Sequence, residues 1–258
     1  MKLEIGVMGQ LSTENVLDDL KFVIDNKFDW FEIGFDWEQN FNLSDKTLNE
    51  IKKLSQENNV KLIVHTAWYL PVCTIIPEVK KAVIENIKKG IDIAKKVGSN
   101  RVTVHPGWRE MPPPALDKNY NALIETLKEL VNYAKKFDIN ICFENNDSGI
   151  CASIEDYKKV SDSVKGIRMT FDVGHANVND NPDEYFAKFN DRIMDVHIHD
   201  NGGEHDEHMC VGEGNIDFKK FFSECKKAKY NGPFILELFP YENILKGRER
   251  FLDIWGKL

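Results

Sequence analysis

The 258-residue sequence lacks the paired cysteines, the long apolar runs and the excess positive charge that mark several protein classes. Its five cysteines include no CxxC pair, which argues against a disulfide framework or a sulfur-ligated zinc site and indicates reduced thiols in the cytoplasm. No run reaches about 18 apolar residues, and the start, MKLEIGVMGQ, does not resemble a signal peptide, so we expect no membrane segment. The net charge of -8 repels polyanions, so any contact with nucleic acid needs a local patch.

Glycine loops for nucleotides are absent as well, because neither GxGxxG nor GxxxxGKS/T follows any run that reads as a strand. Eight short runs rich in β-branched and aromatic residues alternate with eight amphipathic stretches, which is typical of repeated βα units. No linker divides the chain, and its length is close to the roughly 250 residues of one barrel. We therefore predict a single (β/α)8 TIM-barrel domain over residues 1–258, with an open doubly wound sheet as the alternative.

The alternation also predicts where each element lies. Strands are expected at residues 3–8, 30–35, 61–65, 101–105, 140–144, 168–172, 193–199 and 234–239. Helices are expected at residues 14–26, 45–58, 78–97, 117–137, 154–163, 182–189, 218–228 and 244–255. Ser44 before one helix, and Pro77 and Gly98 at the two ends of the next, are ordinary start and stop signals.

Six consecutive strands of this prediction end in a residue that can bind a metal ion. In chain order these residues are His65, His105, Glu144, Asp172, His197 and Glu237. The C-terminal strand ends of such a barrel form the active site, whereas branched aliphatic side chains usually fill its interior. A single histidine at a strand end is most often an ordinary loop residue, but six ligand types in a row need a functional explanation. Mixed imidazole and carboxylate ligands suit zinc, manganese or iron(II), so we predict an open catalytic metal site.

Three further candidate ligands lie just beyond strand ends, namely His175 in DVGHAN and Asp206 with His208 in EHDEHMCVGEGN. Their alternative role is that of a polar surface loop. His205 is a substitute for His208, and His199 shares a strand face with His197 because side chains repeat every two residues. We rank His199 and His205 second.

The motifs carry a resemblance that covers nearly the whole chain from the third strand onward. They read VHTAWYL, VHPG, FENN, DVGHAN, VHIHDN, DEHMCVGEGNI and ILELFP. This set resembles the xylose-isomerase-like barrel superfamily and, within it, the endonuclease IV family of apurinic-site endonucleases. The resemblance implies up to three zinc ions, with manganese as another possibility.

Each of the nine zinc ligands of that family has a counterpart of the same type here. The resemblance implies that His65 and His105 hold a first metal, that Glu144 bridges to a second completed by Asp172, His197 and Glu237, and that His175, Asp206 and His208 hold a third. The GEGNI motif, residues 212–216, is expected to set the geometry of its loop, and Glu213 is a candidate for supporting a metal ligand from outside the coordination sphere.

The sequence departs from the endonuclease pattern in its first two loops, VMGQLS and FDWEQNF, where the arginine that grips DNA in that family is missing. Trp68 and Tyr69 follow His65 where the family places side chains that enter the duplex, so they are candidates for stacking on a substrate. They could equally cover a small pocket. Trp37 and Trp108 are further aromatic residues near the expected site.

Two enzymatic functions follow from these residues. The first is metal-assisted hydrolysis of abasic DNA or a small phosphodiester, with Glu144 accepting a proton from water. The second is isomerisation or epimerisation of a small sugar at one divalent ion, with Glu144 and Glu237 moving a proton. We place the hydrolase first because it uses five ligand-type residues that the second leaves idle: His65, His105, His175, Asp206 and His208. A metal-binding protein without catalysis is the third alternative.

Overall fold

The computed structural model describes residues 3–10, 15–35, 40–108, 110–179 and 181–258. In these residues eight parallel strands close a barrel in sequential order, with β1 paired to both β2 and β8. The strands are β1 Ile5–Met8, β2 Trp30–Gly34, β3 Lys61–His65, β4 Arg101–Val104, β5 Asn140–Glu144, β6 Arg168–Asp172, β7 Ile193–Ile198 and β8 Phe234–Leu236. The predicted (β/α)8 barrel is therefore confirmed, and the open sheet is excluded.

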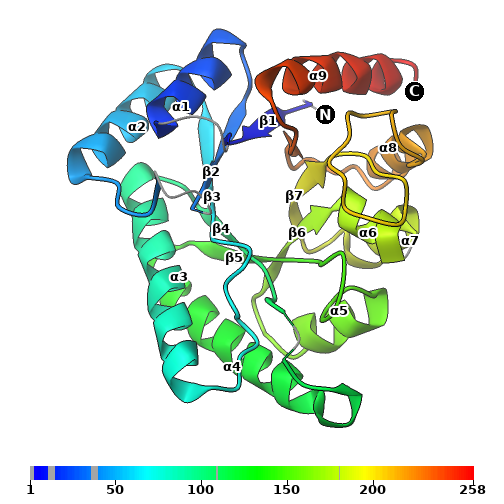
Figure 1. Ribbon diagram of the computed structural model, residues 1–258. Coiled ribbons are helices and arrows are strands. Elements are labelled where there is room, and N and C mark those ends of the chain that lie inside the picture. Colours follow the sequence, from blue (N-terminus) through cyan, green and yellow to red (C-terminus); the bar gives the residue numbers. More distant parts are fainter. Residues whose placement is uncertain (1–2, 11–14, 36–39, 109, 180) are drawn as a thin grey trace.

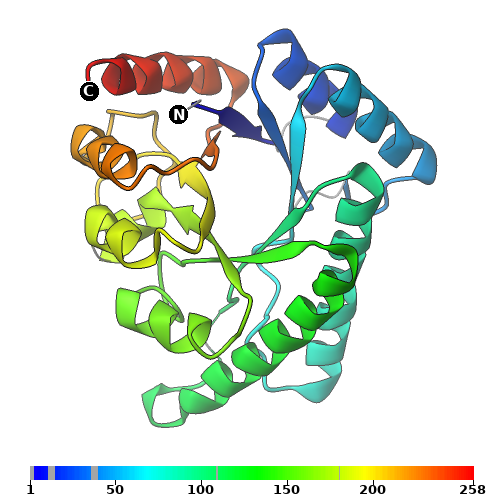
Figure 2. The ribbon, with the colours of Figure 1, turned by 180° about the vertical axis from the view of Figure 1, so that it is seen from behind.

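Helices surround this barrel on the outside, and the last helix, α9, lies beside the first strand (Figures 1 and 2). The helices are α1 Val16–Asp25, α2 Asp45–Glu57, α3 Pro77–Val97, α4 Asp117–Ala134, α5 Ile154–Ser161, α6 Val173–Asn179, α7 Pro182–Phe189, α8 Phe218–Lys227 and α9 Tyr241–Gly256, with short 3-10 turns η2 Pro113–Ala115 and η3 Lys135–Phe137. No described helix has both the length and the apolar character of a membrane span.

Local signals in the sequence set the start of α2 and both ends of α3 as expected. The Ser44 side chain accepts a hydrogen bond from the backbone N–H of Thr47 at 3.1 Å, which satisfies one of the unpaired donors at the start of α2. Pro77 opens α3, and Gly98 ends it in the left-handed region with a φ of 85°. Short helix α6 was not predicted, because DVGHAN reads as a turn.

The reason for α6 is the last residue of β6. The Asp172 carboxylate accepts a hydrogen bond from the backbone N–H of His175 at 2.7 Å, so it caps a helix that begins directly after the strand. The same helix places His175 above the barrel.

The apolar core has two parts. The larger part lies between the sheet and the helices, and the smaller, made of Met8, Trp30, Ile63 and Ile235, fills the barrel interior. Polar residues occupy another layer of the interior, which we call the inner polar layer: Glu32, Arg101, Thr103, Thr170 and Asp195, all buried. Thr103 on β4 contacts Glu32 on β2 and Thr170 on β6, strands that meet only across the interior. Such barrels usually fill this space with branched aliphatic side chains.

Candidate active site

The six ligands predicted at strand ends gather at one end of the barrel. His65, Glu144 and Asp172 are the last residues of β3, β5 and β6, whereas His105 and Glu237 follow β4 and β8 by one residue. His197 lies within β7, which ends at Ile198. Five of the six are buried and Glu237 is half-buried. Parallel strands of a barrel all end on the same side, so the residues come together although they are far apart in sequence.

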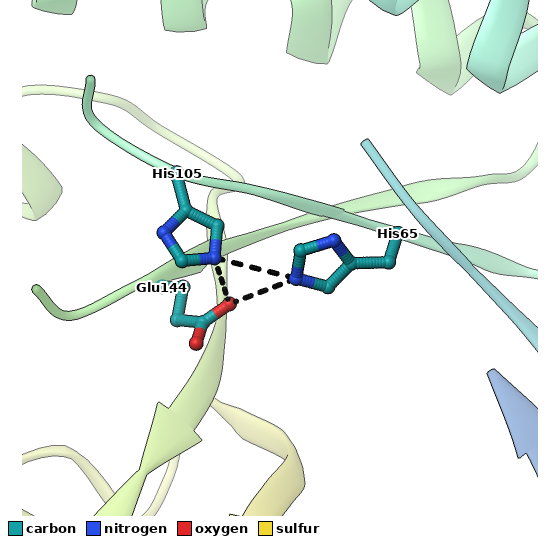
Figure 3. Close-up of side chains that lie close together, drawn as sticks. All are labelled: His65, His105 and Glu144. Atoms are coloured by element: carbon teal, nitrogen blue, oxygen red, sulfur yellow. Dashed lines mark hydrogen bonds and ion pairs between the residues drawn. The ribbon is translucent and has the colours of Figure 1, made fainter. Parts of the chain in front are cut away.

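The first cluster, which we call the β3–β4 group, consists of His65, His105 and Glu144 (Figure 3). The Nε2 atoms of the two histidines are 3.3 Å apart, and the same Glu144 oxygen, Oε2, lies 2.9 Å from His105 and 3.4 Å from His65. Ligands about 2.0–2.1 Å from a tetrahedral cation are separated by about 3.4 Å. Three donor atoms at these separations fit one divalent cation between them.

The second cluster, the central group, consists of Glu144, Asp172, His197 and Glu237, with donor atoms within 4.8 Å of one another. The Nδ1 atom of His197 is buried and makes no aligned hydrogen bond. It faces Glu144 Oε1 at 3.4 Å, Asp172 Oδ2 at 3.8 Å and Glu237 Oε2 at 3.1 Å. A buried ring nitrogen among three carboxylates is a donor set that suits a divalent cation.

The third cluster, the loop group, consists of Asp172, His175, His199, Asp206 and His208, whose ring nitrogens and carboxylate oxygens are joined by contacts of 2.9 to 3.9 Å. The Nδ1 atoms of His175 and His208 lie 2.8 Å and 3.0 Å from the carbonyl oxygens of Asn145 and Glu237. A carbonyl only accepts, so both Nδ1 atoms carry the proton. Without a cation, the Nε2–H groups of both rings donate to Asp206 Oδ2, across 3.3 Å and 2.9 Å, and a bound cation would replace those two protons. This arrangement also fits a cation.

His199, ranked second from the sequence, lies inside the loop group. Its Nε2 is 3.0 Å and 3.1 Å from the two Asp172 oxygens, and its ring stacks on that of His208 with centroids 4.0 Å apart. Gly174 makes room for this ring, because a Cβ there would lie 1.9 Å from the His199 Cε1 atom. His205 is exposed and belongs to none of the candidate metal groups among the described residues.

Residues 201–217 carry Asp206 and His208, and one buried carboxylate holds this loop. Asp200 accepts hydrogen bonds from the backbone N–H groups of Asn201, Gly212 and Ile216 at 2.9, 2.9 and 3.2 Å. The GEGNI motif thus sets loop geometry, as expected. The expectation that Glu213 supports a metal ligand is wrong: its carboxylate is instead paired with Lys246 and Arg250 on α9.

The charges of the three groups balance one another. Burial alone would raise the pKa of Glu144, but His105 and His197 hold it well below its usual range. Burial alone would lower the pKa of His208, but Asp206 and Glu237 raise it to about 10. Ionised carboxylates are therefore matched by protonated imidazoles, and a divalent cation would replace those protons.

A cavity of about 350 Å³ opens over the three groups. It is lined by Met8, His65, Trp68, His105, Gly107, Trp108, Asn146, Asp147, His175, Asp206, His208, Glu237 and Phe239, so the described lining contains no lysine or arginine. Trp68 and Trp108 are 44% and 47% exposed, and their rings meet edge to face at 5.9 Å. Tyr69 packs against Trp68 but lines a separate cavity with Phe35 and Phe41, and Trp37 lies outside the described residues.

Comparison with known proteins identifies the family. Residues 20–254 match the family described as xylose isomerase-like TIM barrel. The chain belongs to this family.

Relatives within the family include an uncharacterised protein of Methanocaldococcus jannaschii, 32% identical over 251 residues that cover 92% of this chain and 83% of that protein. An L-ribulose 3-epimerase of Methylomonas sp. strain DH-1 is 25% identical over 219 residues, covering 80% of this chain and 74% of that enzyme. The crystal structure of a D-tagatose 3-epimerase-like protein has a TM-score of 0.90 to this structure, with 27% identity and 99% of both chains covered.

These findings confirm the xylose-isomerase-like superfamily and overturn the first-ranked function. An endonuclease IV-like hydrolase of abasic DNA or another phosphodiester is wrong, because the relative from Methylomonas is named as a sugar epimerase and the similar crystal structure is described as that of a sugar epimerase-like protein. The physical reason is that ligands at strand ends are compatible with both chemistries. Substrate choice depends on the surrounding loops, and the described cavity lining combines aromatic rings, histidines and carboxylates but contains no lysine or arginine.

The sequence analysis did not identify two residues that hydrogen-bond to candidate metal ligands and orient them. Glu32 accepts a hydrogen bond from His197 Nε2 at 2.9 Å, and Asn145 bonds to the Asp172 backbone on both its N–H and its C=O at 2.9 Å. Both follow the usual pattern in which partners outside the coordination sphere orient the ligands. The alternation in WFEIG, which puts Trp30 and Glu32 on one face, was an available signal for Glu32.

Proposed function

We propose that this protein is a divalent-metal-dependent epimerase or isomerase of a small sugar. The central group carries this proposal, because it combines a candidate metal site with two glutamates from nearly opposite sides of the barrel mouth, Glu144 at the end of β5 and Glu237 after β8. The sugar 3-epimerase among its relatives supports the choice of substrate. So does the D-tagatose 3-epimerase-like structure.

The central group would hold the reactive cation through Glu144, Asp172, His197 and Glu237. A divalent ion there supplies Lewis acidity, which polarises a carbonyl or hydroxyl oxygen of the sugar. Three carboxylates and one imidazole suit manganese as well as zinc. The β3–β4 group and the loop group each offer donors for one more ion, so we propose a capacity of up to three, with zinc as the preferred metal in the histidine-rich groups.

Glu144 and Glu237 would move the proton. One carboxylate takes the proton from the carbon beside the sugar carbonyl, and the C–H electron pair shifts towards the carbonyl oxygen. The other glutamate, which must begin the cycle as a carboxylic acid, then gives its own proton to the opposite face of that carbon as the electron pair returns to it. The centre is inverted, the two glutamates have exchanged protonation states, and proton exchange with solvent restores them. Glu237 lines the cavity directly, whereas Glu144 is buried beneath His65 and His105, which line it.

Trp68 and Trp108 would bind the substrate. Their exposed rings lie at the cavity and offer apolar faces to the C–H groups of a sugar. A cavity of about 350 Å³ is in the range of small-molecule sites. Tyr69 lies one residue beyond Trp68 and supports its ring from the side.

The test is solvent exchange rather than product formation alone. Protein loaded with manganese or zinc is incubated with a panel of ketoses in D2O, and NMR follows deuterium entering the carbon beside the carbonyl together with the new epimer. We expect both with wild type and neither with Glu237→Gln, while Glu213→Gln, a change at an exposed carboxylate bonded to Lys246, behaves as wild type. Absence of exchange across the whole panel in metal-loaded protein would overturn the proposal.

A further inference from the structure

Glu32 is the buried carboxylate nearest to the central group that belongs to none of the candidate metal groups in the described chain. It lies in the middle of β2 and is 0% exposed. Its Oε2 is 2.9 Å from His197 Nε2, and its Oε1 accepts a hydrogen bond from the Thr103 hydroxyl at 2.9 Å. Both oxygens therefore have a partner, and the side chain is held at two points.

The hydrogen bond to His197 has only one chemically consistent direction. An ionised carboxylate can only accept, so the proton must be on Nε2 of the ring. The lone pair of a neutral ring is then on Nδ1, the atom that faces Glu144 and Glu237 at 3.4 Å and 3.1 Å. Because Nδ1 has no other aligned hydrogen bond, the contact with Glu32 at Nε2 leaves Nδ1 as the atom of this ring that can bind a cation.

The inner polar layer holds Glu32 in place. Thr103 also contacts Thr170 at 3.2 Å, which links β2, β4 and β6 across the barrel. Below them Arg101 pairs with Asp195 at 3.2 Å and stacks on Trp30, with its guanidinium carbon 4.5 Å from the ring centroid. Burying charges of this kind in a barrel interior is costly, so the layer needs a purpose beyond packing.

We propose that Glu32 is a positioning residue for the metal: it sets the tautomer and orientation of His197 and raises the basicity of the ring towards the cation. This inference rests on the proposed function only insofar as the central group binds a metal. It does not depend on the identity of the sugar. The effect is transmitted through His197, since Glu32 itself is not a ligand.

The experiment measures zinc and manganese affinity by chelator competition in the full chain. Glu32→Gln keeps an acceptor oxygen but loses the charge, Glu32→Leu loses both, and Thr103→Val removes the hydroxyl that holds Oε1. Loss of partners behind metal ligands typically costs about 10- to 100-fold in affinity. We expect about 10-fold weaker binding for Glu32→Gln, about 100-fold for Glu32→Leu and a smaller loss for Thr103→Val.

A matched control separates positioning from general loss of a buried carboxylate. Asp19, 2% exposed, accepts hydrogen bonds from the Gln10 backbone and from Tyr241, and it belongs to none of the candidate metal groups among the described residues. Asp19→Asn should lower the unfolding temperature and leave metal affinity unchanged. In the zinc-loaded protein, NMR of labelled histidine should show a protected His197 Nε2–H proton in wild type that is lost in Glu32→Leu.

The outcomes separate this inference from the proposed function. Equal affinity in wild type, Glu32→Gln and Glu32→Leu would overturn the role of Glu32, even if the enzyme epimerises sugars. Weaker binding in these variants together with no sugar turnover in wild type would support Glu32 and remove the epimerase. If Glu32→Leu and Asp19→Asn lose affinity in parallel with stability, Glu32 is only structural and the inference fails.

Discussion

The β3–β4 group and the loop group use the same kinds of ligand but hold them by different means. His65, His105 and Glu144 lie at or one residue beyond strand ends, so the barrel itself sets their positions. In the loop group only two residues depend directly on strands: Asp172 ends β6, and His199 follows β7 by one residue. His175 lies on α6, and Asp206 and His208 lie on a loop that Asp200 holds through hydrogen bonds. The comparison teaches that similar ligand sets can be held either by the rigid barrel or by a loop that can move. We therefore expect the β3–β4 group and the loop group to respond differently to mutation.

The largest effect is expected from Glu144→Gln, because this residue belongs to both the β3–β4 group and the central group. It would lose a carboxylate ligand and one of the two proton-moving groups, so turnover should fall by about 10³-fold. The loop group, which does not include Glu144, should keep its ion. Elemental analysis of metal per chain and a sugar epimerisation assay measure the two effects, and unchanged turnover would contradict the assignment.

The next largest effect separates the two groups directly. His105→Ala and His208→Ala should each remove about one equivalent of metal per chain, and the ion of the loop group should be the first released by a chelator from wild type. The physical reason is that the loop can open locally without unfolding the barrel. A wild-type content of one ion, unchanged in both variants, would limit the protein to the central group.

An intermediate effect is expected at the loop anchor. Asp200→Ala removes the acceptor of three backbone hydrogen bonds, and bonds to a charged group contribute about 1.5–3 kcal/mol each before the loop relaxes. The unfolding temperature should drop by several degrees, and the ion of the loop group should be lost while that of the β3–β4 group remains. Differential scanning calorimetry combined with metal analysis tests this. Equal loss of metal from both groups would contradict the proposed difference between the barrel-held and the loop-held ligands.

The smallest effects concern substrate binding at the cavity. Trp108→Ala should raise KM by about 5- to 10-fold with little change in kcat, because the ring contributes apolar contact that is similar in substrate and transition state. Tyr69→Ala should change KM by less than about twofold, since Tyr69 lines another cavity. Steady-state kinetics with the best ketose of the panel measures both effects. An equal rise in KM for the two variants would mean that Tyr69 also contacts the substrate.

Most of the fold and the strand-borne ligands could be predicted because they depend on local patterns. Short apolar runs predicted all eight strands to within a few residues, and their ends supplied six candidate ligands, which the structure brings together. The loop residues His175, Asp206 and His208 could be singled out from their positions just beyond strand ends, but their assignment to a third metal came only from the resemblance. Nothing local in DVGHAN indicates that Asp172 caps a helix and turns His175 over the barrel.

Function was the point at which resemblance misled. Nine ligand types matched an endonuclease, and the geometry brings them together, yet the same donors are compatible with sugar chemistry. The distinguishing parts are the cavity walls, where Trp68 and Trp108 stand without a described lysine or arginine beside them. These walls are formed by loops whose arrangement is not encoded in any short motif.

The sequence by itself determined the barrel, because hydrophobic periodicity and the length of each βα unit are local properties that parallel pairing then repeats. It also determined which ligand types stand at the strand ends. Only the tertiary structure decided that His199 joins the loop group, that Glu213 turns away to α9, and that Glu32 reaches His197 across the barrel. These relations join residues up to 165 positions apart, and such contacts exist only once the barrel has closed.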